Sequence, residues 1–152
     1  MLLTLALAGT AREAHAAFSG NNGKIAFAST RTTGEGVNNP EGEFEIFTMK
    51  LDGTELKQLT FNTAEDSLPS FSADGNMVAF TSFRDGNYEI YKMSSDGSNQ
   101  TRLTNTTWLD AFPTISRDGS KRAYQSERGG IERNLTKNNA SDAAPDWQPF
   151  VK

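Results

Sequence analysis

The 152-residue chain contains no cysteine and a single histidine, His15. Without cysteine it can form no disulfide, no thiolate zinc site and no cysteine nucleophile. Lysine and arginine are scattered singly, and the formal net charge is -4, so the chain offers no basic stripe that could follow a phosphate backbone. These absences argue against a thiol enzyme and against a nucleic-acid-binding protein.

Long apolar runs are missing as well. The run Leu2–Ala8 is too short to cross a bilayer. It is followed by Ala14-His15-Ala16, which fits the small-x-small rule of signal peptidase, so we interpret residues 1–16 as a signal peptide and residues 17–152 as the exported domain. No lysine or arginine precedes Arg12, and an ordinary helical N-terminal segment is the alternative. Removal of the signal would leave a chain with no histidine, the usual base of a Ser-His-Asp triad.

What the chain does contain is a repeat. The stretch Asp66–Thr104 holds four short apolar or aromatic runs separated by turn-forming segments, and shifted copies of its parts lie on both sides. Three motifs recur with a common offset of 44 residues: Glu-Ile-aromatic at 45–47 and 89–91, Asp-Gly at 52–53 and 96–97, and Leu-Thr at 59–60 and 103–104. This period is typical of the four-stranded blades of a β-propeller.

The repeat predicts an all-β fold with propeller-type units, two of them complete and a third shortened. In the central unit we expect strands over 68–72, 77–82, 88–93 and 100–104, and in the first unit over 24–29, 43–49 and 55–60. In the third unit Leu135-Thr136 follows Leu103-Thr104 by 32 residues instead of 44, because the Glu-Ile-Tyr strand and its Asp-Gly turn are missing.

The two ends of the chain complement one another. The chain starts on the second strand of a unit, at 24–29, and ends on the first strand of another, at 144–148. Pairing of these two strands, within one chain or with a partner chain, would complete a blade and cover its exposed edges.

The motifs resemble the TolB-like β-propeller repeat over residues 23–149, best in the central unit with Asp66, Pro69, Phe71 and the segments 72–75, 79–80, 82–86, 89–91, 96–97 and 103–104. The resemblance implies a ring that commonly has six blades, exported from bacteria and used for protein recognition or as an accessory domain of hydrolases. This chain supplies only three units and lacks the separate N-terminal domain of TolB. Two chains sharing one six-bladed ring, an open arc and an internally shortened copy are the alternatives.

Candidate binding residues lie where the first strand of a unit begins and the second ends. A hairpin places Asp66 near Arg84 and Asp110 near Arg128, and closure would place Asp142 beside Arg31. These pairs either form a ring of charges open to a partner or are structural ion pairs that hold the loops. The segment 32–43 carries a nine-residue insertion expected on the same face, and adds further candidates: Gly34, Asn38, Asn39 and Glu41.

No catalytic constellation, metal site or cofactor is expected. The Asp-Gly turns suit the positive φ of hairpins and lack the spaced carboxylates of a calcium loop, and no G-x-S-x-G nucleophile elbow occurs. The sequence therefore favours a non-catalytic module, periplasmic or extracellular, that binds a protein or peptide. Two such chains could form a homodimer that completes a six-bladed ring. The alternative is a propeller fragment or accessory domain of a carbohydrate-active or serine-peptidase-like enzyme.

Overall fold

The computed structural model describes residues 23–116 and 122–126, and every regular element in that part of the chain is a β-strand. The strands are β1 (Lys24–Ser29), β2 (Glu45–Lys50), β3 (Lys57–Gln58), β4 (Asp66–Phe71), β5 (Met77–Ser82), β6 (Glu89–Ser94), β7 (Thr101–Arg102), β8 (Asp110–Ile115) and β9 (Arg122–Ser126). No helix that could span a membrane occurs among these residues.

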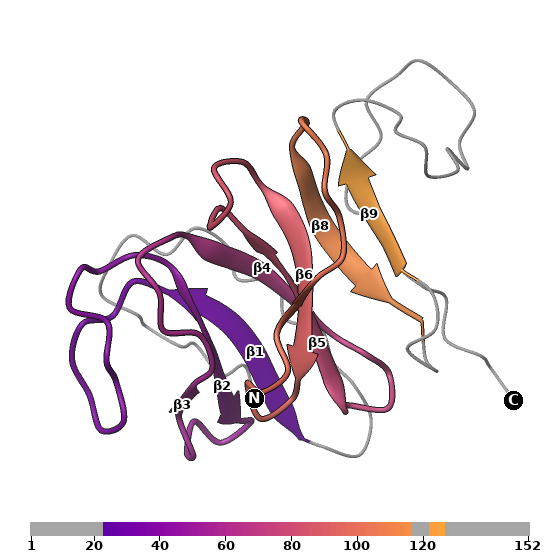
Figure 1. Ribbon diagram of the computed structural model, residues 1–152. Coiled ribbons are helices and arrows are strands. Elements are labelled where there is room, and N and C mark those ends of the chain that lie inside the picture. Colours follow the sequence, from indigo (N-terminus) through magenta and orange to yellow (C-terminus); the bar gives the residue numbers. More distant parts are fainter. Residues whose placement is uncertain (1–22, 117–121, 127–152) are drawn as a thin grey trace, which may run out of the picture.

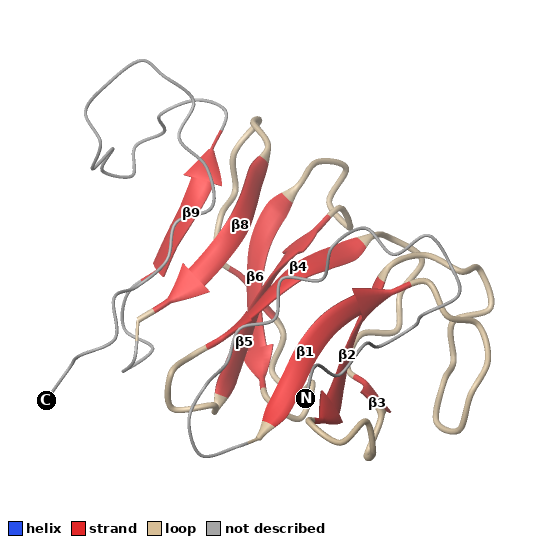
Figure 2. Cartoon of the chain, turned by 180° about the vertical axis from the view of Figure 1, so that it is seen from behind, coloured by secondary structure: helices blue, strands red, loops and turns tan. Residues whose placement is uncertain are grey.

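The strands form three antiparallel sheets, ordered β1-β2-β3, β4-β5-β6-β7 and β8-β9. Within each sheet the strands follow the order of the chain, so neighbouring strands of a sheet are joined by hairpins. The second sheet lies between the other two, and the three are splayed like neighbouring blades (Figures 1 and 2). The all-β blade architecture predicted from the 44-residue period is confirmed.

The observed strands follow the predicted ones closely, except for the outermost strands. Strands β1 and β5 have the predicted bounds, whereas β3 and β7 are each only two residues long. The ladder stops early because threonine hydroxyls take over from the backbone: Thr60 Oγ1 accepts from the Ile46 N–H at 2.8 Å, and Thr104 Oγ1 accepts from the Ile90 N–H at 2.9 Å. The Leu-Thr motif thus ends the outer strand in both units.

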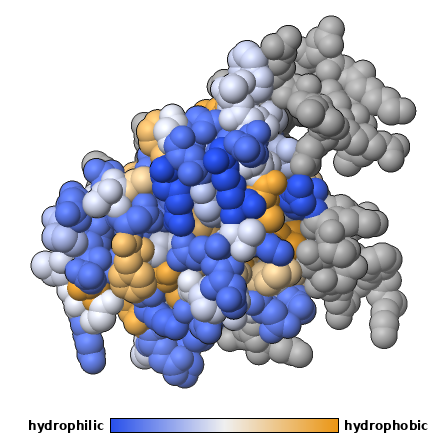
Figure 3. Space-filling view, in the orientation of Figure 1, coloured by the Kyte–Doolittle hydropathy of each residue, from blue (hydrophilic) through white to orange (hydrophobic). Residues whose placement is uncertain are grey.

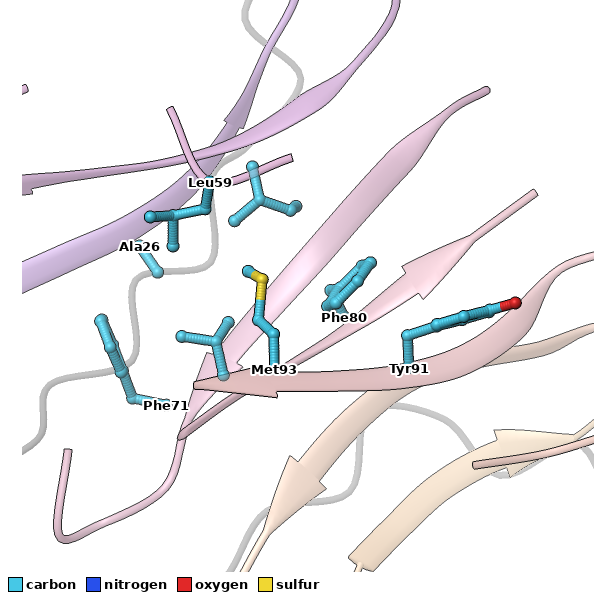
Figure 4. Close-up of a cluster of buried hydrophobic side chains, with 8 residues drawn as sticks. Ala26, Leu59, Phe71, Phe80, Tyr91 and Met93 are labelled. Atoms are coloured by element: carbon cyan, nitrogen blue, oxygen red, sulfur yellow. The ribbon is translucent and has the colours of Figure 1, made fainter. Parts of the chain in front are cut away.

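The core lies between the first and second sheets (Figure 4). Apolar side chains of the two sheets face one another there, and eight of them form one buried cluster: Ala26, Ile46, Leu59, Phe71, Val78, Phe80, Tyr91 and Met93. Burying an apolar side chain of this size contributes about 1.5–3 kcal/mol. Stacking of neighbouring units, rather than any single sheet, therefore provides the stability.

In the second and third units the first strand carries a bulge next to a proline. The register shifts between Ser67 and Ser70 in the second sheet, and an equivalent shift occurs in the third sheet. The residues before the two prolines, Leu68 and Phe112, adopt φ of 53° and 55°. A bulge of this kind bends a strand and re-aims its side chains. It lies directly after the buried aspartate that begins the strand in each unit.

The first sheet has no strand beside β1 among the described residues. Its predicted partner, 144–148, lies outside them, as do the signal peptide and the outer part of the third unit. Pairing of the two chain ends stays a prediction.

Candidate functional site

The connections β1–β2, β3–β4, β5–β6 and β7–β8 emerge at one end of the sheets, here called the loop face. The tight turns β2–β3, β4–β5 and β6–β7 emerge at the other end, here called the turn face. In Figure 1 the loop face is at the top of the sheets and the turn face at the bottom. The sequence-predicted site residues that the structure describes fall on connections of the loop face or on strand ends beside it.

The predicted pair Asp66 and Arg84 is present as a buried ion pair. Arg84 Nη2 lies 2.7 Å from Asp66 Oδ2, and the Asn62 amide donates to the same oxygen at 2.6 Å. The Asp66 side chain is fully buried, and the Arg84 guanidinium lies over the Tyr91 ring, 4.6 Å from its centroid. This geometry matches the structural reading of the pair, since a partner could not reach the carboxylate without displacing the guanidinium.

The other two predicted pairs extend beyond the described residues, because Arg128 and Asp142 lie outside them. Asp110 is fully buried, with Thr106 Oγ1 3.1 Å from its Oδ2, and burial raises the pKa of its carboxyl. The Arg31 guanidinium lies 5.1 Å from the centroids of both Phe27 and Phe47, and burial lowers its pKa. Each charged member observed therefore has the same place in its unit as Asp66 or Arg84.

The insertion 32–43 begins at the loop face but folds back along the outer side of the first sheet, beside β3 (Figures 1 and 2). The Gln58 side chain holds it there: Gln58 Oε1 accepts from the Asn38 N–H at 2.8 Å, and Gln58 Nε2 donates to the Asn38 carbonyl at 3.1 Å. Asn39 is buried and donates to the Glu43 carbonyl at 2.7 Å. Asn39 thus belongs to the framework of the loop, while Gly34 and Glu41 are exposed.

Two fully buried glutamates underlie the loop face, at equivalent positions in the first two sheets. Glu89 accepts from the Thr104 hydroxyl, and from the Thr106 N–H, Arg102 Nη2 and the Asn87 amide at 2.8–2.9 Å. These bonds lower its pKa despite burial. Glu45 accepts from the Asn62 N–H at 2.7 Å, but the position of Arg102 is taken by Gln58. Burial then raises the pKa of Glu45 to about 7.

The sequence analysis missed three large aromatic side chains that are exposed on the loop face. Their exposed fractions are 59% for Phe61, 42% for Phe83 and 40% for Trp108. A usable signal was present, because none of the three follows the repeat: Asn105 stands at the position of Phe61 in the next unit, and Ala64 at the position of Trp108 in the preceding one. Aromatic residues outside the period cannot be explained by packing between blades.

Hydrogen bonds link the three connections that carry these aromatic residues: β3–β4 with Phe61, β5–β6 with Phe83, and β7–β8 with Trp108. The Phe83 N–H donates to the Glu65 carbonyl at 2.9 Å, and the Tyr88 hydroxyl donates to the Glu65 carboxylate at 2.9 Å. The Phe83 and Tyr88 rings pack with centroids 4.9 Å apart. The Asn87 amide then donates to the Trp108 carbonyl at 3.3 Å. We call this surface the aromatic strip, and it consists of Phe61, Phe83, Tyr88 and Trp108.

The rest of the surface is mostly hydrophilic. Apolar residues form small separate groups among hydrophilic ones in the view of Figure 3. On the turn face the one large exposed hydrophobic residue among those described is Leu51. The aspartates of the turns accept from nearby N–H groups, as Asp52 does from Thr54 and Asp96 from Ser98, both at 2.9 Å, and the described residues contain no acidic or histidine cluster able to hold a metal ion.

Comparisons with known proteins agree with this architecture. The chain is similar to the solved structure of a putative TolB from Agrobacterium tumefaciens, with a TM-score of 0.64 and 23% identity over 82% of this chain and 42% of that chain. It is also similar to TolB from Acinetobacter baumannii, with a TM-score of 0.55 and 26% identity over 77% of this chain and 27% of that chain. The tricorn protease shares the fold at 17% identity and a TM-score of 0.51, over 74% of this chain and 11% of that chain.

The chain thus spans less than half the length of each of these structures. No curated protein matches it. The family model described as TolB beta propeller domain matches residues 2–146, nearly the whole sequence. The chain therefore belongs to the TolB beta propeller domain family.

Proposed function

We propose that this chain is an exported, non-catalytic module that binds a protein or peptide on its loop face. The observation that carries the proposal is the aromatic strip. Three large aromatic side chains outside the repeat are exposed together on one face, whereas the aromatic residues that follow the repeat, such as Phe47 and Phe80, are buried. Exposed aromatic residues held on a rigid scaffold are characteristic of protein-binding surfaces.

The carboxylates of the loop face support a binding role rather than catalysis. Asp66 is held by Arg84 and Asn62, and Glu89 by Arg102, Asn87 and Thr106. The hydrogen-bonding partners of these carboxylates are replaced by other polar residues at equivalent positions of neighbouring units, such as Thr106 for Asn62 and Gln58 for Arg102. A structural role explains this pattern. The exposed members of the predicted site, Gly34, Asn38 and Glu41, lie on the insertion beside this face and stay candidates for contact.

Site-specific photo-cross-linking tests the binding role. A photoreactive phenylalanine analogue at position 83 should cross-link to one protein partner in an extract of the cells that encode the chain, and the same analogue at position 51, on the turn face, should not. Both replaced side chains are large, exposed and hydrophobic. No adduct at position 83, or the same adducts at both positions, would overturn the proposal.

Export is tested separately by sequencing the N-terminus of the protein recovered from a bacterial periplasm. We expect the mature chain to begin at Ala17, after the Ala14-His15-Ala16 motif. Recovery of the uncleaved chain from the cytoplasm alone would remove export from the proposal and leave the binding role to the cross-linking result.

A second candidate function is a propeller segment of a larger enzyme. It is favoured by the small share of the compared structures that this chain spans. The reading frame that surrounds the coding sequence decides between the two, since a hydrolase domain continuous with this segment would favour the enzyme.

A further inference from the structure

We propose that the aromatic strip binds a basic peptide segment, with arginine or lysine side chains of the partner lying over its rings. This inference rests on the proposed binding function and adds the chemical class of the partner. The loop face carries an excess of negative charge, its own cations are already engaged, and the exposed rings offer the π-faces that cations prefer.

The described connections and strand ends of the loop face carry far more carboxyl groups than guanidinium groups, and no lysine. The guanidinium groups are those of Arg31, Arg84 and Arg102, and the carboxyl groups are those of Glu35, Glu41, Glu43, Glu45, Glu65, Asp66, Asp85, Glu89 and Asp110. Glu45, Asp66, Glu89 and Asp110 are buried, so the negative charge presented to a partner is that of Glu35, Glu41, Glu43, Glu65 and Asp85. A surface of one sign of charge draws in a partner of the other sign and suppresses partners of its own sign.

The three arginines are engaged within the chain and cannot balance this charge. Arg84 pairs with the buried Asp66 at 2.7 Å. Arg102 is shared between two carboxylates, with Nη2 2.8 Å from Glu89 Oε1 and Nη1 3.4 Å from Asp85 Oδ2. Arg31 lies over two phenylalanine rings. An incoming anion would therefore meet the guanidinium groups of Arg84 and Arg102 already paired with carboxylates, and that of Arg31 packed on two rings.

Two exposed carboxylates lie on the β1–β2 connection, whose last residue is hydrogen-bonded to the start of β4, just after the connection that carries Phe61. Glu43 and Glu41 are exposed, and neither forms an ion pair within the described part of the chain. They precede Phe44, whose carbonyl accepts from the Asp66 N–H at 2.7 Å, next to the loop of Phe61 and Glu65. Cationic side chains of a partner that lay over the rings could thus reach these carboxylates.

The fold already uses this kind of contact internally. The Arg84 guanidinium lies 4.6 Å from the Tyr91 centroid and 5.5 Å from that of Phe80, and Arg31 lies between two rings in the first sheet. Phe61 and Phe83 present rings of the same kind to solvent. A partner arginine on these exposed rings would extend to the surface a packing mode that both sheets use inside.

Fluorescence anisotropy with the full chain tests the proposal, using a labelled peptide of alternating arginine and glycine and a matched peptide of alternating glutamate and glycine. We expect the arginine peptide to bind and the glutamate peptide not to bind. The variant F61S/F83S should weaken arginine-peptide binding about tenfold, whereas L51S, on the turn face, should leave it unchanged. The variant E41Q/E43Q should weaken binding most at low salt, and E55Q, in the β2–β3 turn, should have no such effect.

No binding of the arginine peptide, or binding that F61S/F83S leaves unaltered, would overturn the proposal, because simple attraction to an acidic protein does not depend on two rings. These results are distinguishable from failure of the proposed function. A partner cross-linked at position 83 together with no arginine-peptide binding would refute the basic-peptide inference alone, whereas absence of the cross-link would refute the binding function itself.

Discussion

Glu45 and Glu89 occupy the same position at the start of the third strand of a unit, both side chains are fully buried, and only Glu89 has a guanidinium against it. At the position of Arg102 the first sheet has Gln58. The side-chain amide of Gln58 reproduces one hydrogen bond of that arginine, since Gln58 Nε2 donates to the Thr60 carbonyl at 2.7 Å as Arg102 Nε does to the Thr104 carbonyl at 2.6 Å. The amide cannot supply the positive charge of the arginine.

This difference predicts an unusual dependence of stability on pH. Because burial raises the pKa of Glu45 from 4.5 to about 7, the folded state holds a proton that the unfolded state has already lost between these values. The free energy of unfolding should therefore fall as pH rises from about 4.5 to 7, by up to about 3 kcal/mol. Urea denaturation at several pH values measures the fall.

The variant E45Q is the matched control, because glutamine has no proton to lose. It should remove this component and leave the remaining pH dependence intact. Glu89, whose lowered pKa comes from its bonds to Thr104, Thr106 and Arg102, acts in the opposite direction, since its stabilising contribution is lost as pH falls below the unfolded pKa. Equal slopes for the wild type and E45Q between pH 5 and about 7 would contradict the burial effect.

Removal of the Arg84 side chain should be strongly destabilising. In R84M the fully buried Asp66 carboxylate loses its cation and keeps the hydrogen bond from the Asn62 amide, and breaking a buried pair from one side costs about 3–5 kcal/mol. The exposed pair of Lys50 and Glu55 gives the control, since solvent screens such a pair and K50M should be far less destabilising than R84M. Chemical denaturation of both variants checks the contrast, and similar losses would show that Asp66 is not buried as described.

The turn glycines Gly53 and Gly97 differ in what surrounds them. Both have positive φ, 83° and 91°. A Cβ atom on Gly97 would lie 2.8 Å from the Leu59 carbonyl oxygen, whereas one on Gly53 would meet nothing within 4 Å. In both alanine variants the new Cβ atom is strained at positive φ, which costs about 1–2 kcal/mol, and G97A should lose about 1–3 kcal/mol more through the clash between sheets. Equal melting temperatures for G53A and G97A would contradict that close approach.

Hydrogen exchange tests the predicted pairing of the chain ends. Alternate N–H groups of β1 point away from β2, and they should exchange slowly in the full chain if another strand covers them. In a chain shortened after Ser126 the same groups should exchange rapidly, while those paired with β2 stay protected. Light scattering on the full chain then assigns the covering strand to the same chain, if the protein is a monomer, or to a partner, if it is a dimer. Rapid exchange in the full chain would refute the pairing.

The strands could be predicted well because three motifs of the repeat each mark a different part of the unit. Glu-Ile-aromatic, Asp-Gly and Leu-Thr each perform one task in both units: a buried carboxylate with flanking core side chains, a turn, and a hydroxyl that ends the outer strand. The bounds of β3 and β7 were overestimated because side-chain hydroxyls replace backbone pairing there, and a strand pattern does not reveal that exchange.

The candidate site could be predicted only in part. The pair Asp66 and Arg84 follows from hairpin geometry and was found. The path of the insertion was not found, because it depends on the Gln58 amide, although glutamine at an arginine position was visible in the sequence. The exposed rings of Phe61 and Phe83 could not be predicted from the repeat, because neither residue follows its period. Their exposure also depends on how the loops pack.

The backbone bonds that join neighbouring sheets have a consequence for how this protein folds. The Asp66 N–H donates to the Phe44 carbonyl and the Asp110 N–H to the Tyr88 carbonyl, at 2.7 and 2.9 Å, so each unit docks on residues that lie close to it in sequence. Contacts of this kind cost little loop-closure entropy, and a chain built from them can begin folding in one unit and extend to the next. We expect the four-stranded second sheet to form first and the others to grow from its two sides.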